Sequence, residues 1–392
     1  MFRNWGFMQE FIVSMLVCSI LIVLTRDVAS RYGFVDIPSG RKQHVGPTPT
    51  VGGLAMFIAV LAALLASDLL HGKIAILLGC AAALVVLGVL DDQLDLTVST
   101  RLMIQVFLVT AVIVGADGTV THLGTMFGSD IPLSIFAVPF SVLAFVGGIN
   151  AINMIDGLDG MAGNMALITM LGVATICHFA GAFELLPLTW AMLGTLVGFL
   201  FLNSRIFIKR ALVFMGDAGS MWLGLVLGWF MAQVTHGSVS AEPALVLWLF
   251  GIPLVDSLAV MYRRSKHKRS LFQADRTHIH YLLRHMGFPT KRSVLVLSMA
   301  QLVMVVIGVI FYLAQVPAWI IFWSFVLLLI FYYFLFHIDR PGDRRKNTTV
   351  HYLDFEDRRI NNGNGSSGDR RKNTTDLYLD HEDRRQHTVG RR

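Results

Sequence analysis

The sequence predicts an all-α, polytopic integral membrane protein with about 11 transmembrane helices. Hydrophobic residues make up 55% of its 392 residues and charged residues only 15%, whereas charged residues account for about a quarter of a soluble domain. Apolar runs of roughly the 20 residues that cross a bilayer recur along the chain. Lys and Arg gather in alternate loops between these runs, as they do in short cytoplasmic loops.

Eleven apolar runs give this helix count, and the first and fourth of them are the shortest. All three cysteines lie inside runs, so neither a disulfide framework nor a zinc cluster is expected. The runs are 11–24, 52–70, 74–90, 102–114, 131–146, 161–179, 185–202, 211–234, 244–262, 294–313 and 319–336.

The placement of Lys and Arg predicts the orientation in the membrane. Segments 26–42, 205–210 and 263–269, which follow the first, seventh and ninth runs, are rich in basic residues. The loops after the fourth, sixth and eighth runs contain none. Because short basic loops stay cytoplasmic, we expect the N-terminus outside, in the periplasm, the C-terminus in the cytoplasm and an odd number of spans.

Composition divides the chain into two parts, a membrane catalytic domain at 1–337 and a polar tail at 338–392. The tail contains a duplication, GDRRKNTTVHYLDFEDRR at 342–359 and GDRRKNTTDLYLDHEDRR at 368–385, joined by the flexible composition NNGNGSSG. High charge and few apolar residues predict a disordered cytoplasmic tail. A basic patch that meets anionic lipid is the alternative.

Polar residues cluster at four places on the predicted cytoplasmic side, and such clusters at a membrane mark functional sites. The first, VLDDQLDLTVSTR, ends the third run. If its helix continues past Leu90, Asp91 and Asp95 lie one turn apart on one face, with Asp92 about 100° round. Neighbouring carboxylates repel unless a cation or a shared proton lies between them. A solvated helix end is the alternative.

The second cluster, NAINMIDGLDG, spaces Asn153, Asp156 and Asp159 at intervals of three. Oxygen-bearing side chains one turn apart can converge on a hard cation. The interleaved Gly157 and Gly160 let the backbone approach a ligand closely. An Asp-Gly turn explains either Asp-Gly pair but not the whole set.

The third and fourth clusters supply groups that bind phosphate. FMGDAGSMWLG opens the eighth run with Asp217 in a Gly-rich turn, which presents backbone amides to phosphate, although small residues are common at helix starts. The end of the ninth run and the loop after it combine Asp256 with basic residues, Arg276, His278 and His280. Two histidines at i and i+2 do not share a helical face, so a polyanion is a better partner than zinc. A merely positive-inside loop is the alternative.

Oxygen ligands for a metal, basic donors and a lipid setting together indicate phosphoryl transfer. A transporter or channel is the competing class, but transport sites lie near the membrane midplane, whereas these clusters lie at one surface. A structural membrane anchor with a binding tail leaves the carboxylates unexplained. The sequence contains neither a Walker loop nor a Rossmann fingerprint.

The motifs PTVGG, LDDQLDL, NAINMIDGLDG, FMGDAGS and ADRTHIHYLLRHMGF resemble, in the same order, those of the polyprenyl-phosphate N-acetylhexosamine-1-phosphate transferases, the glycosyltransferase 4 family. The resemblance covers essentially all of the membrane domain. Within the family, the histidine loop and IPLVDSLAVMYRR are most similar to the branch that initiates O-antigen and enterobacterial common antigen. Two departures are HIHY, with Tyr281 where the family has a last histidine, and PTPTVGG from Pro47, which is closer to the peptidoglycan branch.

The resemblance implies transfer of GlcNAc-1-phosphate from UDP-GlcNAc to undecaprenyl phosphate, with release of UMP, at the cytoplasmic face of a bacterial inner membrane. UDP-MurNAc-pentapeptide is the alternative donor. Mg²⁺ or Mn²⁺ is the implied cofactor. The expected partners are the two substrates and membrane lipid, without nucleic acid, and a homodimer stays open.

The resemblance also implies residue roles. Asp217 with Asn153 ligates the metal, Asp91 and Asp92 lie where the lipid phosphate approaches, and the role of Asp156 is open. Asp159 lies near the uridine, Arg101 faces the phosphates, and Arg276, His278 and His280 contact the sugar and diphosphate. The implied catalytic residues are Asp91, Asp92, Asp156, Asp159, His278 and His280, and the substrate-binding residues are Lys42, His44, Arg101, Asn153, Asp159, Arg276 and His278.

Overall fold

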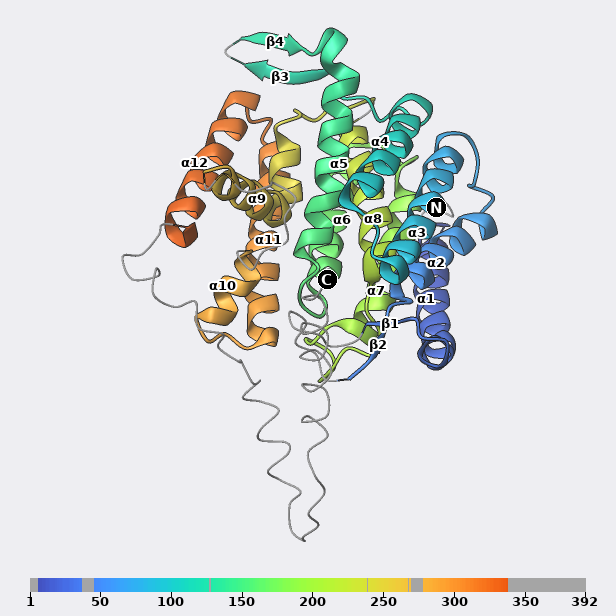
Figure 1. The fold of residues 1–392 in the computed structure, drawn as a ribbon. Coiled ribbons are helices and arrows are strands. Elements are labelled where there is room, and N and C mark those ends of the chain that lie inside the picture. Colours follow the sequence, from blue (N-terminus) through green and yellow to red (C-terminus); the bar gives the residue numbers. More distant parts are fainter. Residues whose placement is uncertain are drawn as a thin grey trace, which may run out of the picture. The chain divides into compact units, whose positions relative to one another are not determined.

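The structure is a computed structural model that describes residues 6–36, 46–126, 128–237, 239–266, 268 and 278–337 (Figure 1). Three of the expected site residues, Lys42, His44 and Arg276, lie outside the described residues, as does the tail 338–392.

The described residues form an assembly of α-helices whose long members run up and down through the bundle (Figure 1). The helices are α1 (Gly6–Arg31), α2 (Gly52–Ala66), α3 (Gly72–Leu94), α4 (Val98–Gly115), α5 (Ala137–Ile155), α6 (Met161–Ala180), α7 (Leu186–Asn203), α8 (Gly216–Gln233), α9 (Leu245–Lys266), α10 (Ile279–His285), α11 (Thr290–Leu313) and α12 (Ala318–His337).

Among the described residues, nine helices are long and apolar enough to cross a membrane, which confirms a multi-pass, helical membrane protein. The other two expected runs fall on α2, which has 15 residues, and on α8. The α8 sequence contains Asp217, several glycines and Gln233, which lower its hydropathy although the helix is mostly buried. The two short runs become α1, with 26 residues, and α4, with 18.

Two small antiparallel hairpins were not predicted. Strand β1 (Val35–Asp36) pairs with β2 (Thr48–Pro49), and β3 (His122–Met126) pairs with β4 (Ser129–Pro132). The β3–β4 hairpin projects beyond the helix ends (Figure 1). Its strands are too short to give a clear alternating pattern in the sequence, so the all-α prediction missed them.

Helix α8 lies at the centre of the bundle, where it packs against α2, α3 and α5 (Figure 1). Small residues let these backbones approach closely, as is common between membrane helices. A Cβ on Gly88 of α3 would overlap the backbone of Ala218, and one on Gly53 of α2 would overlap Gly219. The glycines therefore fix how the start of α8 sits against α2 and the end of α3.

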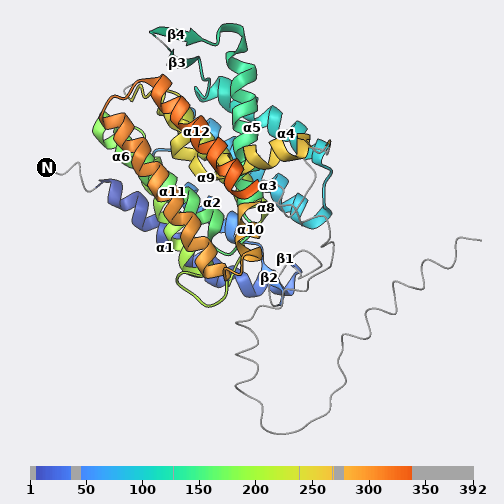
Figure 2. The same cartoon turned by 90° about the vertical axis from the view of Figure 1, so that its left-hand side faces the viewer.

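Helix α9 is broken at Gly251, which has φ 41° and ψ −117°, two residues before Pro253. Gln301 of α11 bonds the backbone that the break leaves unpaired: its Oε1 accepts from the Ile252 amide (2.8 Å) and its Nε2 donates to the Leu249 carbonyl (2.9 Å). Backbone groups at membrane depth need partners within the protein. Figure 2 shows α9 beside α11 and α12, with which it packs.

Candidate active site

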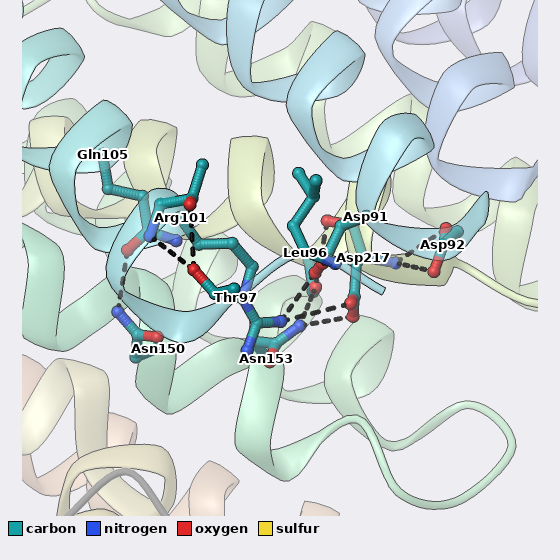
Figure 3. Close-up of polar contacts among 11 residues, drawn as sticks. Asp91, Asp92, Leu96, Thr97, Arg101, Gln105, Asn150, Asn153 and Asp217 are labelled. Atoms are coloured by element: carbon teal, nitrogen blue, oxygen red, sulfur yellow. Dashed lines mark hydrogen bonds and ion pairs between the residues drawn. The ribbon is translucent and has the colours of Figure 1, made fainter. Parts of the chain in front are cut away.

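Three helix ends meet at one end of the bundle and unite side chains from three of the predicted clusters (Figure 3). The Asp217 amide, in the first turn of α8, donates to both carboxylate oxygens of Asp92 in the last turn of α3 (3.2 Å each). Asn153, near the end of α5, donates through Nδ2 to Asp217 Oδ1 (2.7 Å) and Ser220 Oγ (2.9 Å). We name Asp91, Asp92, Asn153 and Asp217 the carboxylate cluster.

Asp92 caps the N-terminus of α8 although it belongs to α3. A carboxylate in this position is stabilised by the free amides and the dipole of the helix. Gly216 makes the approach possible, because it has φ +70° and a Cβ there would lie 2.6 Å from Asp92 Oδ2. The start of α8 was expected to offer its backbone amides to phosphate. One of them, the Asp217 amide, already donates to Asp92.

Asp91 is buried, with a side chain 3% exposed, and is paired with Arg101 of α4. Arg101 Nη1 donates to Asp91 Oδ2 at 2.6 Å and lies 3.7 Å from Asp217 Oδ2. The Leu96 amide donates to Asp91 Oδ1 (3.0 Å). Helix α3 does continue past Leu90, but Asp95 follows its last residue, has φ 49° and is exposed. Asp92, and not Asp95, joins Asp91 in the cluster.

The loop between α5 and α6 brings Asp156 and Asp159 to the same end of the bundle. Burial raises the pKa of the Asp156 carboxyl to about 7, and the nearby charges of Asp159 and Asp92 act in the same direction. Asp159 forms an ion pair with Arg205, which follows α7 (Nε to Oδ2, 2.6 Å). The Asp159 carboxylate is therefore paired with Arg205 of the same chain. The sequence had indicated only a uridine contact for it.

The two histidines lie at the start of α10. His278 Nδ1 bonds Asp256 Oδ2 at 2.8 Å, and the His278 and His280 rings are nearly parallel with centroids 5.9 Å apart. The His280 ring is packed against Gly157, where a Cβ would overlap it. Burial lowers the pKa of His280 to about 4. His280 is therefore neutral at pH 7.

Of the expected site residues, nine lie in the described part, and contacts or electrostatic interactions link them at this end of the bundle. Three side chains that sequence reasoning missed take part: Arg205, which pairs with Asp159; Ser220, which bonds Asn153; and Tyr332 of α12, which donates to Asp256 Oδ1 (2.7 Å). Ser220 stood in the GDAGS motif without a role. Tyr332 lies in an apolar run, where a tyrosine gives no distinct signal.

The carboxylate cluster fits a hard divalent cation when phosphate supplies further ligands. Within the described residues, no three His, Cys, Asp or Glu side chains are grouped closely enough to hold a metal by themselves. Mg²⁺ usually binds one or two carboxylates together with water and substrate phosphates. The Asp217 carboxylate and the side-chain amide of Asn153 match that ligand type. Both hydrogen bonds of Asn153 described above are donated by Nδ2, so its Oδ1 can bind a cation.

A bundle of apolar helices with carboxylates, an arginine and histidines at one end defines a multi-pass membrane protein equipped for an anionic substrate. The model of glycosyl transferase family 4 matches residues 74–235, and these residues include the whole carboxylate cluster. Three similar relatives bear the name undecaprenyl-phosphate alpha-N-acetylglucosaminyl 1-phosphate transferase. That of Salmonella typhi is 34% identical (83% of this chain, 89% of the relative), that of Escherichia coli K12 31% (82% and 89%) and that of Haemophilus influenzae 30% (83% and 92%).

The chain therefore belongs to glycosyl transferase family 4, which confirms the resemblance drawn from its motifs. It is an enzyme of the family that transfers phospho-N-acetylhexosamine to polyprenyl phosphate. Membership implies a sugar nucleotide and a polyprenyl phosphate as its substrates.

Proposed function

We propose that the enzyme transfers GlcNAc-1-phosphate from UDP-GlcNAc to undecaprenyl phosphate, giving undecaprenyl-diphospho-GlcNAc and UMP. This reaction would begin an O-antigen, enterobacterial common antigen or related envelope polysaccharide. The observation that carries the chemistry is the meeting of α3, α5 and α8 at the carboxylate cluster, next to Arg101. The names of the relatives support the choice of donor and acceptor.

In the proposed mechanism, an oxygen of the lipid phosphate attacks the sugar-bearing phosphorus of the donor, and UMP leaves. A phosphomonoester has its second pKa near 6, so the acceptor is mostly dianionic at neutral pH and needs no strong general base. Asp91 and Asp92 therefore position the acceptor and order the start of α8. Bound Mg²⁺ or Mn²⁺ would spread the charge that develops on the diphosphate.

Asp217 and Asn153 are the proposed metal ligands. Arg101, which already contacts Asp91 and Asp217, is proposed to face the phosphates. Asp156 is proposed to join the site in its ionised form. The other proposed substrate contacts are Asp159, His278, His280 and, outside the described residues, Lys42, His44 and Arg276.

We propose the same placement in the membrane as the charge pattern predicts. Helices α2 and α8 would complete eleven spans, with the N-terminus outside and the carboxylate cluster at the cytoplasmic face of a bacterial inner membrane. This arrangement brings the cluster within reach of a cytoplasmic sugar nucleotide. Labelling of single cysteines introduced near Asp117 and near Arg210 tests it, because a membrane-impermeant reagent should reach only the former from outside.

The activity test uses membranes that contain the protein, with undecaprenyl phosphate, Mg²⁺ and either UDP-GlcNAc or UDP-MurNAc-pentapeptide. We expect lipid-linked GlcNAc and UMP from the first donor only, and none from membranes without the protein. Because one phosphoanhydride replaces another, UMP added to the lipid product should regenerate UDP-GlcNAc. Product from UDP-MurNAc-pentapeptide alone would refute the donor assignment, and a labelled protein formed from donor alone would refute direct attack.

A further inference from the structure

Asp256 is almost fully buried, at 1% exposure, yet it accepts three hydrogen bonds, two from the start of α10 and one from α12. Its Oδ2 faces His278 Nδ1 at 2.8 Å. Its Oδ1 accepts from the Ile279 amide (2.9 Å) and from the hydroxyl of Tyr332 on α12 (2.7 Å). An ionised carboxylate can accept several such bonds, so this buried group is well satisfied.

The contacts with Asp256 determine how the His278 ring is protonated and oriented. An ionised carboxylate only accepts hydrogen bonds, so the proton between the two side chains belongs to His278 Nδ1. Nε2 is then the ring nitrogen that remains for a ligand. The Ile279 bond fixes the start of α10, and the Tyr332 bond fixes the second carboxylate oxygen. The ring of His278 thus has a defined tautomer and little freedom to turn.

His278 connects this buried network with the rest of the site. Its ring is nearly parallel to that of His280, and His280 lies against Gly157 in the loop that carries Asp156. Both ring nitrogens of His280 are buried without a hydrogen-bond partner among the described residues. The network therefore runs from α12 through α9 and α10 to the loop after α5.

We infer that Asp256 and Tyr332 are positioning residues that hold His278 so that its Nε2 faces the sugar nucleotide. Asp256 contacts His278 directly, and Tyr332 acts through Asp256. The inference rests on the proposed function, because it takes the sugar nucleotide as the molecule that His278 meets. It gives a role to two buried side chains on α9 and α12, neither of which supplies a member of the carboxylate cluster.

The test compares Asp256→Asn and Tyr332→Phe with wild type and with His278→Gln, in full-length protein, varying the donor and undecaprenyl phosphate separately. Asparagine can donate to Nδ1 and so favours the wrong tautomer. We expect Asp256→Asn to lower kcat/KM for the donor about 100-fold and Tyr332→Phe about 5-fold. KM for undecaprenyl phosphate should stay within about 2-fold of wild type, which a general loss of structure would not allow.

Double variants that combine each substitution with His278→Gln distinguish a positioning role from a merely structural one. In the His278→Gln background, either second substitution should cost less than about 2-fold further, because the group it positions is already gone. Full additional losses in that background, or equal changes in KM for both substrates, would overturn the inference. Tyr332→Phe keeps the test decisive if Asp256→Asn does not fold. Tyr262→Phe is the matched control, since Tyr262 lies on α9 like Asp256 but is 58% exposed and packs against Tyr333, and this change should leave the kinetics unchanged.

Failure of the inference is distinguishable from failure of the proposed function. If wild type uses UDP-GlcNAc and both variants match it, only the inference is wrong. If wild type uses another sugar nucleotide, the same variants are compared with that donor, and the inference stands or falls on the same coupling.

Discussion

The two ends of the α3–α8 pair differ in their polar groups: one carries an ion pair, and the other carries the carboxylate cluster. The two helices are antiparallel, so α3 brings Lys73 to one end and Asp91 to the other, while α8 brings Gln233 and Asp217. At the first end Lys73 forms an ion pair with Asp117, whose carbonyl accepts from Gln233 Nε2 (2.7 Å). A cavity of ≈ 630 Å³ lies there, lined also by His236 and Glu184.

Charge balance and burial distinguish the two ends. Lys73 and Asp117 are 56% and 64% exposed, and each charge has an opposite partner. At the carboxylate cluster Asp91 is 3% exposed, and Arg101 serves both Asp91 and Asp217 while Asp92 adds a further negative charge. Neighbouring like charges favour binding of a cation between them. The two ends therefore differ in the kind of polar cluster, and the excess of carboxylates is what makes the carboxylate cluster the candidate site.

The largest expected difference between the ends comes from Asp217→Asn. Losing this carboxylate removes a proposed metal ligand, so we expect kcat/KM to fall at least about 1,000-fold. Asp117→Asn at the opposite end is the matched control and should change kcat/KM less than about 2-fold. Both variants should appear in the membrane at wild-type levels on immunoblots. Transferase activity retained by Asp217→Asn would show that the comparison is wrong.

Replacing Arg101 with Gln tests the charge compensation within the cluster. The buried Asp91 loses its cation, so we expect a loss of about 2 kcal/mol in stability and about 100-fold in kcat/KM. Adding Asp91→Asn should restore part of the stability, because it removes the buried unpaired charge, but not the activity. Thermal unfolding in detergent and kinetics measure the two effects. A double variant no more stable than Arg101→Gln would contradict the compensation.

The raised pKa of Asp156 predicts competition between protons and the metal. With a pKa of about 7, the carboxyl is mostly protonated below that pH and ionised above it. A divalent cation favours the ionised form, so apparent Mg²⁺ affinity should rise as pH increases through 7. Saturating Mg²⁺ should shift the acid limb of the kcat/KM profile to lower pH. An acid limb that does not move with Mg²⁺ would exclude Asp156 from the site.

The smallest effect is expected at the end of the α3–α8 pair where Lys73 pairs with Asp117. Lys73→Ala breaks an exposed ion pair, which contributes about 0–1 kcal/mol, and leaves the carboxylate cluster untouched. We expect unchanged kcat/KM and a shift of less than about 1 kcal/mol in thermal stability. A loss of activity as large as that of Arg101→Gln would mean that the two ends are coupled.

Sequence reasoning predicted those members of the candidate site whose residue type alone carries a signal. Asp91, Asn153 and Asp217 stand out because carboxylates and amides beside apolar runs are rare. It missed the partners that only packing creates: Arg205 read as a topology signal but holds Asp159, and Tyr332 read as part of a span but bonds Asp256. Interhelical pairs have no fixed spacing in the chain.

The fold, like the candidate site, could be predicted from the sequence only in part. Hydrophobic runs predicted where the long helices lie, because bilayer thickness sets their length. The same pattern did not predict the break at Gly251, which depends on Gln301 of another helix. It also overlooked the β3–β4 hairpin, and it did not predict that α8 is mostly buried.

Binding of Mn²⁺ to the purified protein, followed by electron paramagnetic resonance with and without UDP-GlcNAc, tests the central claim most directly. We predict that one Mn²⁺ binds per chain and that UDP-GlcNAc increases its affinity. Asp217→Asn should abolish this binding, and Asp117→Asn should retain it. Equal binding to wild type and Asp217→Asn, or loss of binding in Asp117→Asn alone, would contradict a cation site at the carboxylate cluster.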